Sequence, residues 1–556
     1  MSISIDYQDG EIQLNFPYNM NYINLIKTTT QNRRWNPEKR KWIMGLSDLQ
    51  DQFIPTLKQQ NIEFSFTDRY KDFFMKGPEL INDFGLKFPL YPYQLESANK
   101  LYNNPKFGLF HEMGLGKTIV AIALINKLSQ ETPDIITPVE RINGIQALVV
   151  CPSSLKKQWA DEITKFSDLD CTVIGGTKKK REEQWSEYST IKIINYENLR
   201  FDNQAFEKEW DVVVLDESTR VKNFSSKTSQ KTKMLKNKRK IIATGTPLEN
   251  SVADIYSMFQ FLDPMVLGKW YDFKDEFLVT ETKHFSGHEF EVITGSKNHD
   301  LLDKKIKPYY IRYKKDEVFA DLPKLIEEKI YVQLLPTEKK WYNHIKSMIE
   351  SKIEIIKQGE DVSIGGELQL LRILCNGEVC LKKSNTTNLE IISKQDQMTE
   401  ISSKIEETLV LLKQIIMQKE KVIVFNSYTT PLGILGLRLQ AEGIKYAFLH
   451  GGSDKEKEIE MFKTQEDVKV FLCQTKTGGY GLNLQEANNI IFMNLPWTDA
   501  AKEQAISRAH RCGQEKPVFV YTLVVQDTIE EKVLETIKEK KSISEKVIKQ
   551  DIHKYI

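Results

Sequence analysis

The sequence predicts an α/β protein with two parallel-sheet lobes, a mostly helical insertion between them and a small α+β module in front. From about Phe88, short and almost continuously apolar runs alternate with helical segments, as in a parallel sheet covered on both faces. The alternation stops over residues 251–410 and returns from Lys421, whereas the segments before Phe88 resemble hairpins. The chain is therefore expected to divide into the α+β module at 1–75, the first lobe at 88–255, the helical insertion at 256–410, the second lobe at 411–527 and a C-terminal tail at 528–556.

Residues 1–75 are expected to form the α+β module. Alternating apolar and polar residues flank an Asp-Gly pair within 3–16, which favours a hairpin. A helical stretch follows at 21–27, and a second hairpin with an Asn-Pro turn is predicted over 33–44. An amphipathic helix over 48–60 completes the unit.

The two lobes are predicted from their apolar runs. Buried strands are expected at 147–151, 191–195, 211–215 and 240–244 in the first lobe, and at 421–425, 445–450, 468–473, 489–494 and 518–525 in the second. The insertion is expected to contain a strand at 329–334, a helix that begins at Pro336 and an exposed loop at 360–367. The tail after Thr528 is predicted to be helical.

Composition indicates a globular chain without identifying its partner. The 556 residues are 40% hydrophobic and 28% charged, with a formal net charge of +1. A nucleic-acid surface would therefore require local separation of the 78 Lys and Arg from the 77 Asp and Glu. No apolar run reaches the roughly 18 residues that span a bilayer. The first residues lack the basic start and apolar core of a secretory signal.

The six cysteines predict neither a disulfide framework nor a zinc site, because none forms a Cys-x-x-Cys pair and the closest two are Cys375 and Cys380. This usage favours a reducing, intracellular location. The high content of Lys, Ile and Asn is typical of an AT-rich genome such as a bacterial or viral one, so a cytoplasmic location is expected rather than a nuclear one. The basic run at 178–181 is interpreted as a solvated loop and not as a nuclear signal.

The segment HEMGLGKT lies between a short predicted strand and a helix. Gly114 and Gly116 allow the backbone to wrap a phosphate, and the following helix directs its amide groups at the anion. Lys117 can reach the β- and γ-phosphates, and the Thr118 hydroxyl can bind Mg²⁺. His111 occupies the first glycine position of the strict phosphate-loop pattern, so a plain glycine-rich turn is the alternative for this segment by itself.

Two carboxylates end a buried strand in the segment VVVLDEST. Burial of Asp216 and Glu217 there is costly unless they serve a cation or a reaction. Asp216 can bind Mg²⁺, and Glu217 can polarise the attacking water. The alternative is a strand that simply ends in a polar loop, and the phosphate-loop pattern about 100 residues upstream argues against it.

Basic and glycine-rich segments follow near the far end of the chain. Arg508 and Arg511 are predicted to share one face of a helix, where they could contact a γ-phosphate or form a solvated basic surface. The loop CQTKTGGYGLNLQEA contains Gly478, Gly479 and Gly481, which permit close approach of a backbone or phosphate, or a plain turn.

Ten ordered motifs carry a specific resemblance. They are YQ, HEMGLGKT, LVVCPSSLKKQW, INYE, LDEST, ATGTPLEN, KVIVFNS, LHGG, QTKTGGYGLNL and QAISRAHRCGQ. The set resembles the SWI/SNF-type ATPases of helicase superfamily two over roughly residues 88–540. The last two motifs are particularly distinctive of that family.

This resemblance implies an ATP and Mg²⁺ site. Residues that match the nucleotide-binding positions are Gln94, Met113, Gly114, Leu115, Gly116, Lys117, Thr118, Gly481 and Gln504. Thr118 and Asp216 match the magnesium positions, and the catalytic set is Lys117, Asp216, Glu217, Arg508 and Arg511. The motif that couples hydrolysis to lobe movement is matched by Thr244, Gly245 and Thr246.

It also implies a DNA track, mostly along backbone phosphates. The matching positions are Ser153, Lys156, Ser427, His450, Thr475 and Lys476. Two residues depart from the family pattern. His111 replaces an acid, and Thr219 stands where a histidine or glutamine is usual. The second departure puts the coupling of turnover to movement in doubt, not ATP binding.

The N-terminal module resembles the HARP-like module of annealing helicases. Arg33, Arg34 and Lys41 are expected to contact DNA phosphates. Trp35 and Trp42 could stack on exposed bases or pair across the predicted hairpin.

The resemblance therefore implies a monomeric, DNA-dependent ATPase with two RecA-like lobes, which tracks along double-stranded or forked DNA without separating its strands. Remodelling of forks or junctions, strand annealing and displacement of bound proteins all stay open as its task. A non-hydrolysing DNA adaptor is the first alternative, and the complete catalytic set argues against it. An RNA-directed helicase is the second alternative, and the residues of the motifs within 478–514 argue against it.

Overall fold

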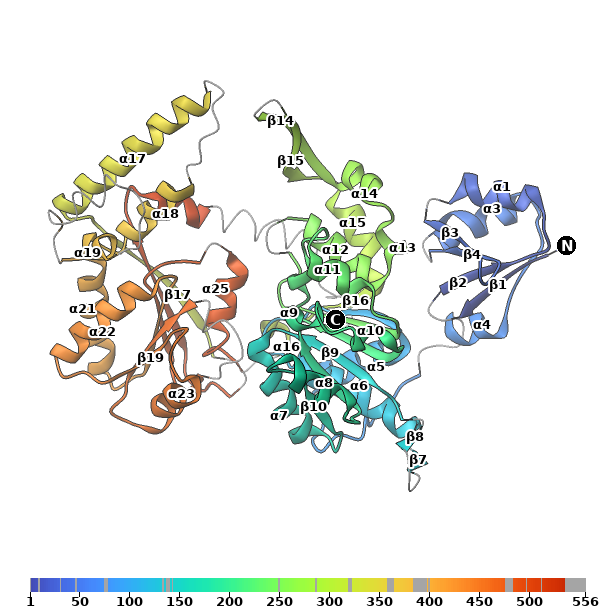
Figure 1. Cartoon of the computed structure of the whole chain (residues 1–556), viewed down its shortest axis with the longest axis horizontal. Helices are drawn as coiled ribbons and strands as arrows, with labels where there is room; N and C mark the ends of the chain where they lie inside the picture. Colours follow the sequence, from blue (N-terminus) through green and yellow to red (C-terminus); the bar gives the residue numbers. More distant parts are fainter. Residues whose placement is uncertain are drawn as a thin grey trace. The chain divides into compact units, whose positions relative to one another are not determined.

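The computed structural model describes most of the chain, in two compact units (Figure 1). The described residues are 2–8, 11–30, 32–45, 48–74, 79–132, 135–136, 141–142, 144–248, 251–285, 288–318, 323–357, 365–383, 398, 401–475, 484–496, 498–511 and 513–535. The first unit takes the described parts of 1–279 and 293–318, and the second those of 280–292 and 319–543. Each unit contains a parallel sheet, which confirms the predicted α/β class.

The N-terminal module is a five-stranded mixed sheet in the order β3-β4-β2-β1-β5. Its elements are β1 (Ile3–Gln8), β2 (Glu11–Asn15), α1 (Met20–Thr29), β3 (Arg33–Asn36), β4 (Lys41–Met44), η1 (Leu49–Phe53), α3 (Ile54–Gln59), β5 (Phe64–Phe66) and α4 (Asp68–Phe74). Both predicted hairpins are confirmed, since β1 pairs antiparallel with β2 and β3 with β4. Asn19 begins α1 by accepting the Asn21 and Tyr22 N–H groups.

The first lobe is built on a seven-stranded sheet in the order β10-β11-β9-β12-β13-β6-β16. Its strands are β6 (Lys106–Leu109), β9 (Ala147–Cys151), β10 (Cys171–Val173), β11 (Ile191–Asn195), β12 (Trp210–Asp216), β13 (Asn237–Ala243) and β16 (Tyr310–Ile311). All neighbouring strands run parallel. Every residue of β9 and β11 is buried, as the continuous apolar runs predict.

Helices cover this sheet, and a two-stranded hairpin follows α14 in the sequence (Figure 1). The helices are α5 (Pro92–Asn103), α6 (Lys117–Glu131), α7 (Lys156–Phe166), α8 (Lys178–Ser186), α9 (Tyr196–Leu199), α10 (Gln204–Glu207), α11 (Lys227–Lys233), α12 (Ala253–Leu262), α13 (Pro264–Leu267), α14 (Trp270–Phe277), α15 (His299–Ile306) and α16 (Lys315–Val318). The shorter elements are β7 (Ile135–Ile136), β8 (Arg141–Ile142), η2 (Ser153–Leu155), η3 (Ser218–Val221), η4 (Lys307–Tyr309) and the hairpin β14 (Leu278–Phe285) and β15 (His288–Ser296).

The second lobe is a six-stranded parallel sheet in the order β17-β22-β21-β18-β20-β19. Its strands are β17 (Leu325–Val332), β18 (Val422–Asn426), β19 (Tyr446–Leu449), β20 (Val470–Gln474), β21 (Asn489–Phe492) and β22 (Val518–Val525). The helices are α17 (Pro336–Lys357), α18 (Gly365–Leu374), α19 (Glu378–Lys382), α21 (Ser403–Met417), α22 (Thr429–Ala441), α23 (Lys455–Thr464) and α25 (Asp499–Ile506). Among the described residues, no helix combines the length and apolarity needed to cross a membrane.

Two segments predicted as loops begin helices instead. The run at 178–181 opens α8, because the Thr177 side chain accepts the Lys180 N–H and Arg181 forms an ion pair with Asp202 at 2.8 Å. The predicted loop at 360–367 is wrong at its end, where α18 has already begun.

The start of α18 is accompanied by an ion pair with the preceding helix, α17. Glu367 is only 7% exposed and pairs with Lys352 of α17 at 2.8 Å. Residues 360–364 of that predicted loop lie outside the described residues. The stretch expected to be mostly helical also supplies an edge strand to each sheet, namely β16 and β17.

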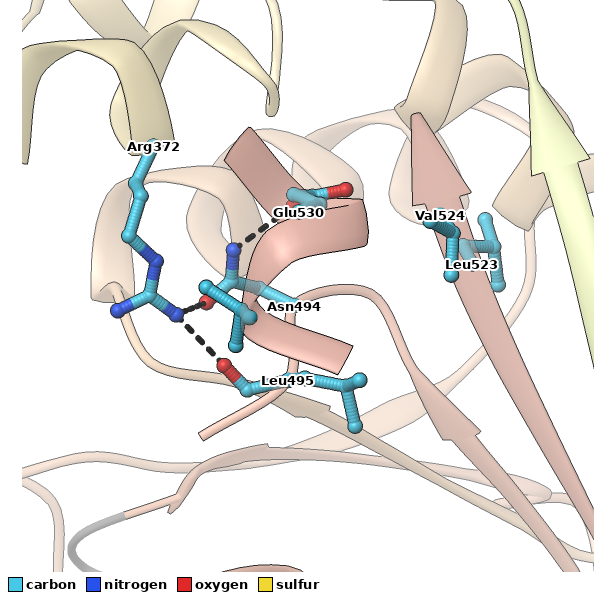
Figure 2. A pocket seen from close by; sticks show the side chains of 7 residues that line it. Arg372, Asn494, Leu495, Leu523, Val524 and Glu530 are labelled. Atoms are coloured by element: carbon cyan, nitrogen blue, oxygen red, sulfur yellow. Dashed lines mark hydrogen bonds between the residues drawn. The ribbon is translucent and has the colours of Figure 1, made fainter. Parts of the chain in front are cut away.

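A buried polar cluster joins α18 and α21 to the segment after β21 and to Glu530, and Figure 2 shows its members Arg372, Asn494, Leu495 and Glu530. The ammonium of Lys404, which is 0% exposed, lies 2.6 Å from Oε1 of Glu530. Asn494 donates to the same oxygen at 3.0 Å. Arg372 of α18 donates to Asn494 Oδ1 at 2.8 Å and to the Leu495 carbonyl at 2.6 Å. Four segments distant in sequence therefore depend on one another's charges and hydrogen bonds.

Replacement of Lys404 by methionine tests this cluster. Because Glu530 would stay buried without its cation, we expect lobe 2 to lose about 3–5 kcal/mol of unfolding free energy. Urea unfolding followed by hydrogen exchange of lobe 2 peptides measures the loss. Lys413→Met is the control, since its 2.8 Å pair with Glu442 is partly exposed and is expected to contribute less than about 1 kcal/mol. Equal losses in the two variants would contradict the assignment.

Candidate functional site

The phosphate-loop candidate lies between β6 and α6, as the sequence predicts. Gly114 and Gly116 have φ values of +86° and +73°, a region that favours glycine. A Cβ at Gly116 would lie 2.5 Å from Nε2 of Gln94, so close packing also requires glycine here. The 15 residues of α6 begin directly afterwards at Lys117, which gives the loop a helix N-terminus.

Gln94, the proposed adenine-reading residue, packs on this loop. It is 5% exposed, and its Nε2 donates to the Leu115 carbonyl at 3.4 Å while its Oε1 accepts the Tyr91 N–H at 3.1 Å. The Tyr93 hydroxyl donates to the same Leu115 carbonyl at 3.2 Å. The structure therefore brings the first motif and the phosphate loop together.

The ammonium of Lys117 is held over the start of the loop. Its Nζ donates to the carbonyl of His111 at 3.0 Å and to that of Glu112 at 3.4 Å. These bonds place the positive charge of Lys117 inside the glycine-rich turn, where an anion would be attracted. Thr118 follows in the first turn of α6.

Asp216 ends β12 in the middle of the sheet and is only 7% exposed. Its Oδ2 accepts the indole N–H of Trp159 at 2.8 Å, and its Oδ1 accepts the Glu217 N–H at 2.9 Å. The Tyr196 hydroxyl donates to its main-chain carbonyl at 2.8 Å. Burial raises the pKa of Asp216, and the indole N–H and the charge of Lys117 oppose that rise.

Glu217 has a left-handed backbone, with φ of +49°. This conformation is uncommon for a residue that is not glycine, and such strain concentrates at functional sites. Ser218 and Thr219 enter η3 directly afterwards and are 0% and 7% exposed. Thr219, the departure from the family pattern, is therefore a buried side chain.

The proposed coupling motif packs on the phosphate loop. Thr244, Gly245 and Thr246 follow β13, the strand between β12 and β6. A Cβ at Gly245 would lie 2.8 Å from Cγ of Met113, so these two backbones approach closely. The Thr246 N–H bonds the Thr244 hydroxyl at 3.2 Å.

His111 ties three parts of the site together, a role that sequence reasoning missed. Its Nδ1 accepts the Tyr313 N–H at 3.2 Å, so the ring proton lies on Nε2. That N–H donates to the Ser97 hydroxyl at 2.9 Å, and Ser97 donates in turn to the Tyr93 carbonyl at 2.6 Å. Complete burial, assisted by the charge of Lys117, lowers the pKa of His111 to about 3. The ring is therefore neutral near pH 7.

Asp216 and Thr118 offer oxygen ligands, which Mg²⁺ prefers. Each carboxylate oxygen of Asp216 accepts one N–H hydrogen bond, which leaves a further lone pair on each. No group of three or more His, Cys, Asp or Glu side chains in the described part of the chain could hold a metal ion. A magnesium ion would thus rely on nucleotide phosphates and water for most of its ligands, as is usual for this ion.

The predicted helix face that carries Arg508 and Arg511 is wrong, because α25 ends at Ile506. The Arg508 N–H bonds the Ala505 carbonyl three residues back, in a tight turn. The Arg508 carbonyl accepts the Leu484 N–H at 3.0 Å, a long-range bond made just beyond the end of the helix.

Gln504 lies in the last turn of α25 and is 9% exposed. Its carbonyl accepts Nε of Arg508 at 3.1 Å, so two of the candidate residues of this motif are in contact. Gly481 and Lys476 lie outside the described residues, as do Gly478 and Gly479.

The DNA-track candidates of the second lobe gather at one sheet edge. Ser427, Thr475 and His450 follow β18, β20 and β19, three adjacent parallel strands. Gln474 donates to the Ser427 carbonyl at 3.4 Å, and the Ser453 hydroxyl accepts the His450 N–H at 2.8 Å.

In the first lobe, Ser153 and Lys156 follow β9. Nζ of Lys156 donates to the Ile174 carbonyl at 2.8 Å, and partial burial lowers the pKa of Lys156. The ammonium of Lys156 is therefore partly directed toward the protein. A phosphate contact is less favoured for this side chain than for a fully exposed lysine.

In the N-terminal module, Trp35 and Trp42 face each other across the β3–β4 hairpin, with ring centroids 5.6 Å apart. The pairing interpretation is thus confirmed, although Trp35 stays 48% exposed. Arg34 forms an ion pair with Glu11, and Nζ of Lys41 lies 4.0 Å from Asp6. Part of the positive charge expected to face DNA is balanced inside the module.

Two parallel-sheet lobes and a phosphate loop beside the Asp216–Glu217 pair, of which Asp216 is buried, define a helicase-type ATPase. The family profile of the SNF2-related domain matches residues 93–421, and that of the helicase conserved C-terminal domain matches residues 404–513. The chain belongs to the SNF2-related family. The N-terminal module lies outside both matches, so its HARP-like character stays a prediction.

Several relatives share this architecture in sequence. An uncharacterized ATP-dependent helicase of Mycoplasma pneumoniae is 30% identical over 81% of this chain and 41% of its own length. The human SWI/SNF-related matrix-associated actin-dependent regulator of chromatin subfamily A member 1 is 29% identical over 83% of this chain and 44% of its own. The chain thus spans less than half the length of these two relatives.

A solved structure, described as the Sulfolobus solfataricus SWI2/SNF2 ATPase core in complex with dsDNA, is 25% identical. It covers 85% of this chain and 100% of its own, with a TM-score of 0.40.

The neutral state of His111 predicts a pH dependence of stability. Folding lowers its pKa from 6.5 to about 3, so unfolding takes up a proton as pH falls through that window. Lobe 1 is therefore expected to lose about 2 kcal/mol between about pH 6.5 and pH 5 through this group.

Hydrogen exchange of lobe 1 peptides in urea, near pH 7 and near pH 5, measures the effect. His111→Asn is expected to remove about 2 kcal/mol of the pH dependence. His299→Asn, which changes a partly exposed ring elsewhere in the same unit, is the matched control. A wild-type pH dependence in His111→Asn would show that the imidazole does not carry it.

Proposed function

We propose that this protein is an ATP-dependent translocase of double-stranded DNA, which remodels forks or junctions or displaces bound proteins. The observation that supports it most is the convergence, at one edge of one sheet, of the phosphate loop, the Asp216–Glu217 pair and the 244–246 motif. These are the parts that an ATP-hydrolysing motor needs for phosphate binding, metal binding and coupling.

The roles follow from the chemistry of each side chain. Lys117 neutralises the β- and γ-phosphates, and the helix N-terminus behind it binds the phosphates through main-chain N–H groups. Asp216 and Thr118 hold Mg²⁺, which when bound would neutralise charge on the transferring phosphoryl group. Glu217 orients and polarises the attacking water, while Arg508 and Arg511 act on the γ-phosphate. Gln94 reads the adenine ring.

The proposed DNA contacts are mainly with backbone phosphates. Ser153 and Lys156 in the first lobe, and Ser427, His450 and Thr475 in the second, all follow the carboxyl ends of parallel strands. Contacts of this kind give little sequence preference but strong dependence on salt. A motor that moves along the duplex needs contacts of this kind, because it must release the DNA backbone and bind it again at each step.

ATP turnover with different nucleic acids tests the proposal. Duplex or forked DNA is expected to stimulate hydrolysis strongly, whereas RNA is not. Lys117→Ala is the blank, and Glu217→Gln is expected to reduce turnover by about 100-fold or more while nucleotide still binds. Glu183→Gln, which changes an exposed carboxylate of α8 in the same lobe, is the matched control and should retain turnover. Absence of turnover above the blank with every nucleic acid would favour the non-hydrolysing adaptor.

Salt dependence tests the nature of the DNA contacts. Neutralising several phosphates releases counterions, so the DNA concentration that gives half-maximal stimulation is expected to rise steeply from about 50 to 200 mM salt. Unstimulated turnover should change much less over the same range, because the phosphate loop is partly enclosed. A half-maximal DNA concentration that is independent of salt would contradict a phosphate-directed grip.

A further inference from the structure

Trp159, the last residue of the LVVCPSSLKKQW motif, contacts the proposed magnesium ligand Asp216. It has none of the site roles described above. Its indole N–H donates to Oδ2 of Asp216 at 2.8 Å, between groups that are 57 residues apart in sequence. Both side chains are buried, at 2% and 7% exposure. An indole N–H can only donate, and a hydrogen bond from it to an ionised carboxylate is stronger than one between neutral groups.

This bond fixes the orientation of the carboxylate. Oδ1 of Asp216 already accepts the Glu217 N–H at 2.9 Å, so each oxygen receives one donor from a different direction. The Tyr196 hydroxyl holds the Asp216 carbonyl at 2.8 Å, which limits movement of the main chain as well. Loss of the indole donor would leave one oxygen free to turn about the side-chain bonds.

The helix that carries Trp159 begins at a proposed DNA contact. Ser153 lies in η2, Lys156 is the first residue of α7 and Trp159 follows three residues later. Residues three apart on a helix lie on neighbouring turns of one face, separated by about 4.5 Å along the axis. Trp159 and Ile163 form the buried side of α7. A rigid element of less than one turn thus connects the DNA-side end of α7 with Asp216.

We propose that Trp159 is a positioning residue, which holds Asp216 in the orientation that binds Mg²⁺, and that α7 transmits DNA contact at Ser153 and Lys156 to this carboxylate. The second half of this inference rests on the proposed function. It gives a physical route by which DNA stimulates hydrolysis within a single lobe. A catalytic group displaced by about 1 Å can lose about 100-fold in rate, so a small shift of α7 is sufficient.

Removal of the indole donor is expected to weaken metal binding, because one oxygen of Asp216 would lose the hydrogen bond that orients it. Packing alone would not preserve this orientation, because an apolar ring of similar size fills the space without donating.

Trp159→Phe separates these two roles, since phenylalanine keeps an aromatic ring and removes the N–H. The measurement is the Mg²⁺ concentration that gives half-maximal Mg²⁺-dependent binding of a fluorescent, non-hydrolysable ATP analogue to the full chain. We expect this concentration to rise about tenfold, the effect of losing one hydrogen bond to a charged group. Binding of the analogue without Mg²⁺ should be unchanged.

Trp210→Phe is the matched control. Trp210 is 0% exposed, belongs to the same lobe and donates its indole N–H to the Ala205 carbonyl at 2.9 Å, not to a carboxylate. Its variant loses the same kind of group and should keep the wild-type Mg²⁺ dependence. Trp159→His, which retains a ring N–H, is expected to fall between wild type and Trp159→Phe. Equal Mg²⁺ dependence in Trp159→Phe and Trp210→Phe would overturn the positioning role.

The proposed transmission of DNA contact through α7 is tested by a separate measurement, the ratio of ATP turnover with duplex DNA to turnover without it. In Trp159→Phe this ratio is expected to fall about tenfold at saturating Mg²⁺, while the DNA concentration for half-maximal stimulation stays constant. An unchanged ratio would overturn transmission through α7. If wild type itself lacks DNA-stimulated turnover, the proposed function fails, and the Mg²⁺ titration still decides the role of Trp159.

Discussion

The buried carboxylate of Asp216 is the constraint on which the rest of the first lobe depends. It stands at the end of a central strand, 7% exposed, where an ionised group without partners would be strongly disfavoured. The chain meets this cost with donors from separate elements: the Glu217 N–H on one oxygen and the Trp159 indole on the other. The Tyr196 hydroxyl holds the carbonyl of the same residue. A carboxylate held in this way is ready for a cation, because no reorganisation is needed when the cation arrives.

Parallel sheets explain why the remaining parts of the site meet there. In such a sheet the loops that follow the strands all lie at one edge, where α/β proteins generally bind ligands. The loops after β6, β9, β12 and β13 carry the phosphate loop, the start of α7, the carboxylate pair and the 244–246 motif. His111 adds a neutral link in place of the family's acid, joining α5 and the segment after β16 to the phosphate loop. A neutral ring makes this link without placing a second buried negative charge near Asp216.

Local sequence signals predicted the elements that depend on local chemistry. Continuous apolar runs predicted β9, β11, β12 and β18 because these strands are buried on both faces. Elements set by distant contacts were missed or misplaced. The end of α25 is followed by the bond from Leu484 to Arg508, and the start of α18 is accompanied by the pair of Glu367 with Lys352. The bond from Trp159 to Asp216 joins two motifs that looked independent along the chain. Sequence spacing identified which residues belong to the site, but not which of them hold the others in place.

The proposed function requires that hydrolysis at this site drives movement along intact duplex DNA. Displacement of a triplex-forming oligonucleotide from a long duplex tests this requirement most directly, because a translocase removes the third strand without separating the other two. We expect ATP-dependent displacement by the wild-type protein and none by Glu217→Gln, with no unwinding of a partial duplex under the same conditions. Failure to displace the third strand despite DNA-stimulated ATP turnover, or unwinding of the duplex itself, would contradict it.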